Sequence, residues 1–231
     1  MLAAVTIRSD GEASTSVYIE SGSKRVFACA LHWPGWCRSG KNEAQALEAL
    51  AAAAPRYAVV AAAAGLPFPT QAGNAFEVVE RLPGSAGTDF GVPGEITSLD
   101  TEPVPAQEAE RLAGLVGASW GVFDQVAAAA PAQLRKGPRG GGRDPAAIIA
   151  HVLSAEAAYA RKLGIRQSPP LPEDTAAITA LRADIARALS APSDGAAVVE
   201  RGWPQRYAAR RIAWHVLDHA WEIEDRSDAT T

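Results

Sequence analysis

The segment Arg211-Ile-Ala-Trp-His-Val-Leu-Asp-His-Ala-Trp-Glu-Ile-Glu224 decides the fold of the second half of the chain. It contains two histidines, His215 and His219, four residues apart in an otherwise helical pattern. Four residues make about one helical turn, so both imidazoles leave the same face of the helix. That face also carries apolar residues at the three-to-four-residue spacing of a buried stripe, namely Ile212, Val216 and Ile223. The segment predicts a helix with two histidines on or beside its inward face.

A third histidine lies in a second helical run, between Asp144 and Glu156. His151 is flanked there by Ile148 and Val152 and so also belongs to an apolar face. A single histidine on such a face is more often a hydrogen-bonded core residue than a ligand. A pair at four-residue spacing presents two nitrogens to one ion, and a third imidazole completes a ligand set. We therefore predict that His151, His215 and His219 bind a divalent metal.

Composition limits the possible partners and the compartment. The chain has 231 residues and a formal net charge of −4, which disfavours nucleic acid or an anionic membrane as the main partner. Cys29 and Cys37 are its only cysteines and form no Cys-x-x-Cys motif, so we expect two half-buried thiols in a reducing cytoplasm. The N-terminus lacks signal-peptide features, and the alanine-rich run 44–65 carries charged residues and Pro55 that favour an amphipathic helix over a membrane span.

Residues 1–82 carry the signals of a small sheet with one helix. A helix is expected from an Asn42 cap to about Val60, interrupted at Pro55. Strands are predicted at residues 4–8, 16–20, 25–31, 36–38 and 76–82, with turns at Asp10-Gly11 and Pro34-Gly35.

The rest of the chain predicts four amphipathic helices. A Pro/Gly-rich linker is expected at residues 83–104, followed by a four-helix bundle over 105–231. The bundle helices are expected to run from Pro105 to near Pro131, from Asp144 to Gly164, from Pro172 to just before Pro192, and from Pro204 onward. The predicted class is thus α+β, with an N-terminal sheet-and-helix module and an up-down bundle. The second and fourth bundle helices must be neighbours for the three imidazoles to meet.

The order of these histidines resembles that of the DinB-like metal-binding bundles. A histidine in the second helix, then His-x-x-x-His in the fourth, and an aromatic-bearing first helix carry the resemblance, which covers about residues 105–226. It implies His151, His215 and His219 as the metal ligands. It also implies a thiol-dependent transferase or isomerase activity, in which a low-molecular-weight thiol takes part.

The N-terminal part resembles HicB-like antitoxin modules. The stretch Val26-Phe-Ala-Cys-Ala-Leu-His-Trp-Pro-Gly-Trp-Cys-Arg-Ser-Gly-Lys-Asn-Glu-Ala-Gln-Ala-Leu47 carries this similarity, which covers residues 16–61. No ribbon-helix-helix segment for DNA binding follows it. The resemblance therefore implies a module for homodimerisation or for binding a protein partner. His32 lies in this stretch; a turn histidine is the simpler interpretation, and an approach to the metal from this module is the alternative.

Three imidazoles leave coordination positions open, as in catalytic metal sites. Zinc or nickel suits imidazole best, and such an ion lowers the pKa of a bound thiol or water. Asp218 and Glu222 are candidate catalytic residues, as proton acceptors or as partners that orient a histidine ring. The alternative for both is a solvated position on the outer face of the helix. Because imidazole must be deprotonated to bind a metal, affinity should fall below about pH 6.5.

Two arginines are candidates for binding a substrate or cofactor. Arg211 stands one turn before His215 and could bind a carboxylate; a solvated charge cluster with Arg206 and Arg210 is the simpler alternative. Arg143 and Arg139 belong to a glycine-rich stretch before the second bundle helix, where an anion could bind; a simple connector is the alternative.

Two functions follow from these features. The first is a metal-dependent enzyme, a thiol S-transferase or hydrolase acting on a small molecule in the cytoplasm. The second is a non-catalytic interaction protein, with a HicB-like partner-binding module and a structural metal. A fourth protein ligand such as His32 or Asp218 would favour the second function, and an open position would favour the first.

Overall fold

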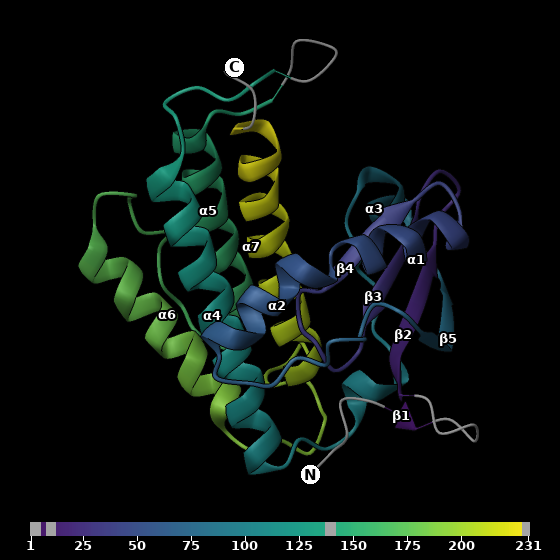
Figure 1. Ribbon diagram of the computed structural model, residues 1–231. Helices are drawn as coiled ribbons and strands as arrows, with labels where there is room; N and C mark the ends of the chain where they lie inside the picture. The colour runs from purple at the N-terminus through teal and green to yellow at the C-terminus, as the bar shows by residue number, and fades with distance from the viewer. Residues whose placement is uncertain (1–5, 8–12, 137–141, 228–231) are drawn as a thin grey trace.

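The computed structural model describes residues 6–7, 13–136 and 142–227, and its fold is α+β as expected (Figure 1). The sheet and two short helices form one part, and four long helices form the other. The elements of the first part are β1 (Thr6–Ile7), β2 (Ala13–Ser21), β3 (Val26–Ala30), β4 (Cys37–Gly40), α1 (Glu43–Ala52), α2 (Ala54–Ala63) and β5 (Phe76–Pro83). Then follow α3 (Ala86–Phe90), the 3-10 helix η1 (Ser98–Thr101), α4 (Ala106–Ala129), α5 (Pro145–Lys162), α6 (Thr175–Ser190) and α7 (Gln205–Ser227).

Strand β2 is the centre of the sheet. It pairs antiparallel with β3, which pairs antiparallel with β4, and β5 lies parallel to β2 on its other side. The first predicted strand is described only at Thr6 and Ile7, which pair with Ser14 and Ala13; the expected Asp10-Gly11 turn lies outside the described residues.

The helix predicted from Asn42 to Val60 is divided near Pro55 into two helices, α1 and α2. Asn42 caps α1, because its side chain accepts a hydrogen bond from the backbone N–H of Gln45 at 2.9 Å. The chain bends by 51° between α1 and α2, and Pro55 lies in the first turn of α2, where a missing N–H costs no helical hydrogen bond.

The four long helices form the expected bundle, with α7 packed against both α4 and α5 (Figure 1). The second and fourth bundle helices are therefore neighbours. Helix α5 ends next to Gly164, whose φ of 83° is the left-handed conformation that glycine tolerates. Asp144 precedes α5 as predicted, but its side chain makes no cap; it accepts hydrogen bonds from Leu134 N and Lys136 instead.

Both parts of the chain share a hydrophobic cluster. Trp36 and Tyr57 of the N-terminal part lie in the same cluster as Leu115 of α4 and Leu217 and Trp221 of α7. The predicted Pro34-Gly35 turn packs directly on α7: Gly35 has a φ of 92°, and a Cβ there would lie 2.7 Å from a methyl carbon of Leu217. Since this core crosses between the two parts, the N-terminal module is docked on the bundle rather than tethered to it.

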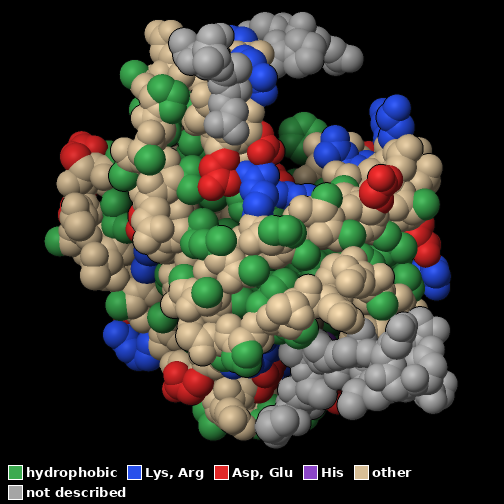
Figure 2. Space-filling model, viewed as in Figure 1, with side chains coloured by type: hydrophobic (Ala, Val, Ile, Leu, Met, Phe, Trp, Pro, Cys, Tyr) green, Lys and Arg blue, Asp and Glu red, His purple; other side chains and the backbone are tan. Residues whose placement is uncertain are grey.

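The docked surfaces are bordered by charged pairs. Arg56 of α2 forms ion pairs with Asp225 at 2.8 Å and with Glu224 of α7, and Arg38 of β4 lies 3.8 Å above the ring of Trp221. In Figure 2, basic and acidic side chains are in contact on the face of the molecule where the two parts meet.

Among the described residues one helix, α4, is long and apolar enough to cross a membrane by length and composition. The bent pair α1 and α2 meets the same criteria only if the two helices are taken together as one span. The apolar side of α4 is buried in the bundle, at Leu112, Val116, Trp120 and Phe123, so within the described residues α4 has the features of a core helix.

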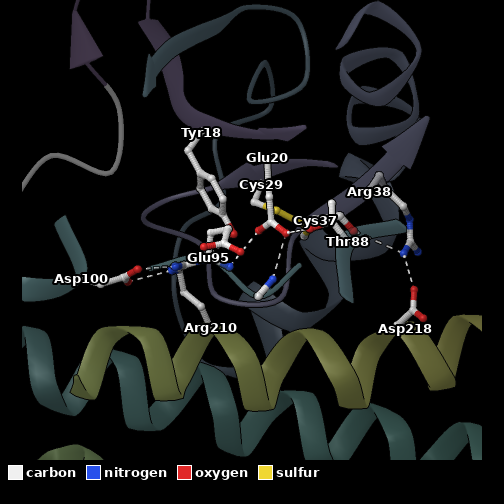
Figure 3. The surroundings of a disulfide bond; sticks show 11 residues. Tyr18, Glu20, Cys29, Cys37, Arg38, Thr88, Glu95, Asp100, Arg210 and Asp218 are labelled. Carbon is white, nitrogen blue, oxygen red and sulfur yellow. Dashed lines mark hydrogen bonds and ion pairs between the residues drawn. A yellow bond between two sulfur atoms is a disulfide. The ribbon is translucent and has the colours of Figure 1, made fainter. Parts of the chain in front are cut away.

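The segment 83–104, predicted as a linker, contacts both the sheet and helix α7. Glu20 of β2 is fully buried and accepts hydrogen bonds from the backbone N–H groups of Gly94 and Glu95 at 3.1 and 3.0 Å. Asp100 of η1 binds Arg210 of α7 (Figure 3). The segment therefore connects the sheet to the bundle through buried polar contacts.

The structure corrects the expectation that the two cysteines are separate thiols. Cys29 and Cys37 lie opposite each other on β3 and β4, with Cα atoms 4.1 Å apart, and they form a disulfide (Figure 3). The prediction of two separate thiols was wrong because it took no account of strand register, which brings residues eight positions apart face to face. Disulfides are rare in the cytosol, so the cysteines no longer support a reducing compartment.

A buried network joins η1, β2 and α7. Arg210 donates to Asp100 at 2.9 Å and to the hydroxyl of Tyr18 at 2.7 Å, and all three residues are at most 8% exposed. Burial raises the pKa of Tyr18 to about 12, so its hydroxyl stays protonated. Burial alone would lower the pKa of Arg210, but Asp100 and Tyr18 raise it above its ordinary value.

We predict that Asp100→Asn destabilises the protein by about 3–5 kcal/mol, because it leaves the Arg210 charge buried without a counter-charge. Urea unfolding followed by circular dichroism measures this. The double variant Asp100→Asn/Arg210→Met should regain part of the loss, since the isolated charge is gone. Glu110→Gln, at an exposed position of α4, is the matched control and should change stability by less than about 0.5 kcal/mol. Equal stability of Asp100→Asn and wild type would contradict the role assigned to the network.

Candidate metal centre

The three predicted ligands meet between α5 and α7. His151 lies on α5, and His215 and His219 lie one turn apart on α7. One ring nitrogen of each histidine lies within 4.8 Å of those of the other two. His215 is buried, whereas His151 and His219 are half-buried, so the cluster has a side that faces solvent.

The spacing of the nitrogens fits one ion. Nε2 of His215 and Nε2 of His151 are 3.2 Å apart. Two imidazole nitrogens bound to a tetrahedral zinc at about 2.0–2.1 Å would be roughly 3.3 Å apart. A single N–H···N hydrogen bond could also hold two of the rings. It would not account for the ring nitrogen of His219, which lies within 4.8 Å of the other two.

Burial keeps two of the rings neutral. It lowers the pKa of His215 well below the usual range, and the charges of His219 and Arg211 lower it further. Burial, followed by the charge of His219, also lowers the pKa of His151. A neutral imidazole has a free lone pair, so both rings are ready to act as ligands at neutral pH.

Glu222 orients the third ring. Its Oε2 lies 2.9 Å from Nδ1 of His219, and its Oε1 accepts a hydrogen bond from Arg226 at 2.7 Å. The hydrogen bond with His219 is the largest cause that lowers the pKa of Glu222, so the carboxylate is ionised. An imidazole that donates through Nδ1 presents Nε2 to a metal, and a carboxylate partner fixes the ring in that orientation.

Asp218, the other candidate catalytic residue, makes its described polar contact with the sheet. Its carboxylate lies 3.4 Å from Nη1 of Arg38 on β4 and points from α7 toward the sheet (Figure 3). The described polar contact of Asp218 is therefore with the N-terminal module and not with a histidine. One position in the helix, about 100° of rotation, separates it from His219 and is enough to place it on another face.

His32 also lies away from the cluster. It is half-buried, and the pKa of its ring is lowered first by burial and next by the charge of Arg111 on α4. Among the described residues, the group of three histidines contains neither His32 nor Asp218.

The two candidate arginines have different surroundings. The guanidinium of Arg211 lies 4.6 Å from the ring of Trp214 and 5.3 Å from that of Tyr159. Arg143 is exposed just before α5, and its charge contributes to lowering the pKa values of His151 and His215. Arg139 lies outside the described residues.

Sequence reasoning missed the aromatic border of the site. Tyr159 packs edge-on against His215, with ring centroids 5.6 Å apart, and also contacts Trp203. Tyr159 stands eight residues after His151, which is about two turns along the same face of α5, so its spacing was the available signal.

Comparisons with known proteins do not identify the chain: no family model, curated protein or solved structure matches it.

We predict that Glu222→Gln weakens zinc affinity about 10- to 100-fold, because a neutral amide orients and polarises the His219 ring less well than a carboxylate. Competition with a zinc-binding dye measures the change. Asp218→Asn is the matched control, one turn away on the same helix, and should leave the affinity unchanged. The reverse ranking of the two variants would contradict the orientation assigned to Glu222.

Metal occupancy should depend on pH with a definite direction. Since burial lowers the pKa values of His151 and His215, their rings stay deprotonated to a lower pH than free histidine, whose pKa is about 6.5. Bound zinc should therefore be retained at pH 6.5 and released as the pH falls further. Metal content after gel filtration at stepwise lower pH measures this, with circular dichroism to confirm folding. Release that is complete above pH 6.5 would contradict it.

Proposed function

We propose that the protein is a metal-dependent enzyme of the DinB-like class, a thiol S-transferase or hydrolase acting on a small molecule. The observation that carries the proposal is the convergence of three imidazole nitrogens within 4.8 Å, with no fourth protein ligand among the described residues. Catalytic sites of this kind keep a coordination position for water or substrate, whereas structural sites are closed by protein ligands.

The donor set fits a divalent transition metal. Neutral imidazoles suit zinc and nickel, and two of the three rings are held neutral by burial. When bound, such an ion supplies Lewis acidity, which lowers the pKa of a thiol or water and makes it a nucleophile near neutral pH.

Residues of the chain itself would hold the histidine ligands in place and fix the orientation of their rings. Glu222 fixes the tautomer of His219 and is itself held by Arg226. Because both of its oxygens are engaged and it is ionised, its contacts support a positioning role more than that of a mobile proton acceptor. Tyr159 limits the movement of His215 and covers one side of the site with an apolar ring.

The competing function, an interaction protein with a structural metal, finds less support. A structural metal site would need a fourth protein ligand. The two residues considered for that role contact other groups: Asp218 pairs with Arg38, and His32 lies near Arg111. A dimerising or partner-binding role of the HicB-like module remains compatible with the enzyme proposal.

A cytoplasmic location is part of the proposal. The burial of α4 in the bundle supports a protein that works outside a membrane, and the Cys29–Cys37 disulfide is the feature that opposes a reducing compartment.

The first test is metal content of protein made without a histidine tag. Plasma mass spectrometry should find about one zinc or nickel ion per chain in the wild type, and less than about a tenth of that in His151→Ala, His215→Ala and His219→Ala. His32→Ala is the matched control and should keep its metal. Circular dichroism shows whether each variant is folded.

The outcomes separate the two functions. Metal at one site, together with transfer of a thiol to an electrophile or hydrolysis that the histidine variants lose, supports the enzyme. A wild type that stays metal-free after incubation with zinc and nickel would overturn the proposal and leave the histidines as core residues.

A further inference from the structure

Arg211 differs from the other arginines of α7. Arg206 pairs with Glu108, Arg210 with Asp100, and Arg226 with Glu222. The side chain of Arg211 makes no ion pair or hydrogen bond with another described residue, and its Nη1 is buried without a partner. A buried donor without an acceptor is costly, so an unpaired guanidinium in this place needs an explanation.

Aromatic rings, not a carboxylate, hold Arg211 in place. The ring of Trp214 lies 4.6 Å and the ring of Tyr159 5.3 Å from the centre of the guanidinium. Such contacts order a guanidinium while leaving its charge available to another anion. The residue as a whole is only partly buried, so it remains open to solvent on one side.

The same two rings connect Arg211 to the histidine cluster. Tyr159 and Trp214 contact His215, with ring centroids 5.6 and 6.1 Å away. Arg211 and His215 are one turn apart on α7, about 5.4 Å along the helix axis. The charge of Arg211 also lowers the pKa of His215, so the guanidinium and the imidazole lie close to each other.

The carboxylates of this region are already engaged. Glu222 contacts His219 and Arg226, and Glu156 of α5 is buried against Arg182 of α6. The positive charge of Arg211 therefore remains without a counter-charge among the described residues.

We propose that Arg211 binds the carboxylate of a small anionic substrate whose thiol reaches the histidine cluster. This inference rests on the proposed function and adds the substrate class to it. The planar guanidinium offers two parallel N–H donors to a carboxylate, a recognition that a neutral amide cannot reproduce. A short molecule suffices, because the arginine and the nearest histidine are only one turn apart.

The test uses the full chain loaded with cobalt(II), whose absorption changes when a thiolate binds. The probes are mercaptoacetate and its neutral counterpart mercaptoacetamide, which differ only in the carboxylate. Wild type should bind mercaptoacetate at least about 10-fold more tightly, as expected for one charge-assisted pair. Arg211→Gln should lose this preference while it still binds cobalt and mercaptoacetamide as the wild type does.

Two further variants complete the design. Arg211→Lys keeps the charge but not the planar pair of donors, and should keep only part of the preference. Arg161→Gln, an exposed position on α5, is the matched control and should keep all of it.

The outcomes distinguish this inference from the proposed function. If cobalt binds and the wild type does not discriminate between the two thiols, or if Arg211→Gln discriminates as well as the wild type, the inference is overturned and the metal site stands. If cobalt does not bind at all, or if neither thiol changes the spectrum, the inference falls together with the thiol chemistry on which it rests.

Discussion

The burial of α7 is the constraint on which the rest of the structure depends. One face of this helix packs on α5 and carries the histidines, and another contributes Leu217 and Trp221 to the core shared with the N-terminal module. A helix that is covered on several sides buries polar side chains, and each of these needs a hydrogen-bond or ion-pair partner. Arg210 meets this demand with Asp100 and Tyr18, which come from a 3-10 helix and from the central strand. The ion pair therefore ties the sheet, the segment 83–104 and the bundle to one helix.

The angular positions of Glu222 and Asp218 on α7 give the two carboxylates different partners. Glu222 stands three residues after His219 and returns to the same face, where it fixes the ring. Asp218 precedes His219 by one residue and faces the sheet, where Arg38 neutralises it. Two carboxylates within one turn thus serve different purposes: one orients a candidate ligand, and the other helps to dock the N-terminal module.

Features that depend on neighbouring residues could be predicted from the sequence, whereas contacts between residues far apart in the chain could not. Local signals located the Asn42 cap, the break near Pro55 and the end of α5 at Gly164, because each depends on the backbone of a few neighbouring residues. Helical periodicity placed the three histidines on inward faces, and the adjacency of α5 and α7 brought them together. The pairs Arg38–Asp218 and Asp100–Arg210 join residues 180 and 110 positions apart, and no local pattern indicates them. The disulfide depends on the register between β3 and β4, and the packing of residues 83–104 depends on Glu20 of β2; both are set only by the assembled sheet.

If the histidines hold a metal ion, the charges around them favour an anionic ligand over a second cation. Burial and neighbouring positive charge keep His151 and His215 neutral, which frees their lone pairs for a metal but gives the site no negative charge of its own. The carboxylate nearest to the cluster, Glu222, is shared between His219 and Arg226, so its charge is largely compensated there. A divalent ion bound by three neutral imidazoles would keep its full charge, and the unpaired Arg211 would add to it. A centre of that kind would attract thiolate, hydroxide or carboxylate from solution. Neutral ligands around the ion therefore favour an anionic molecule as its partner.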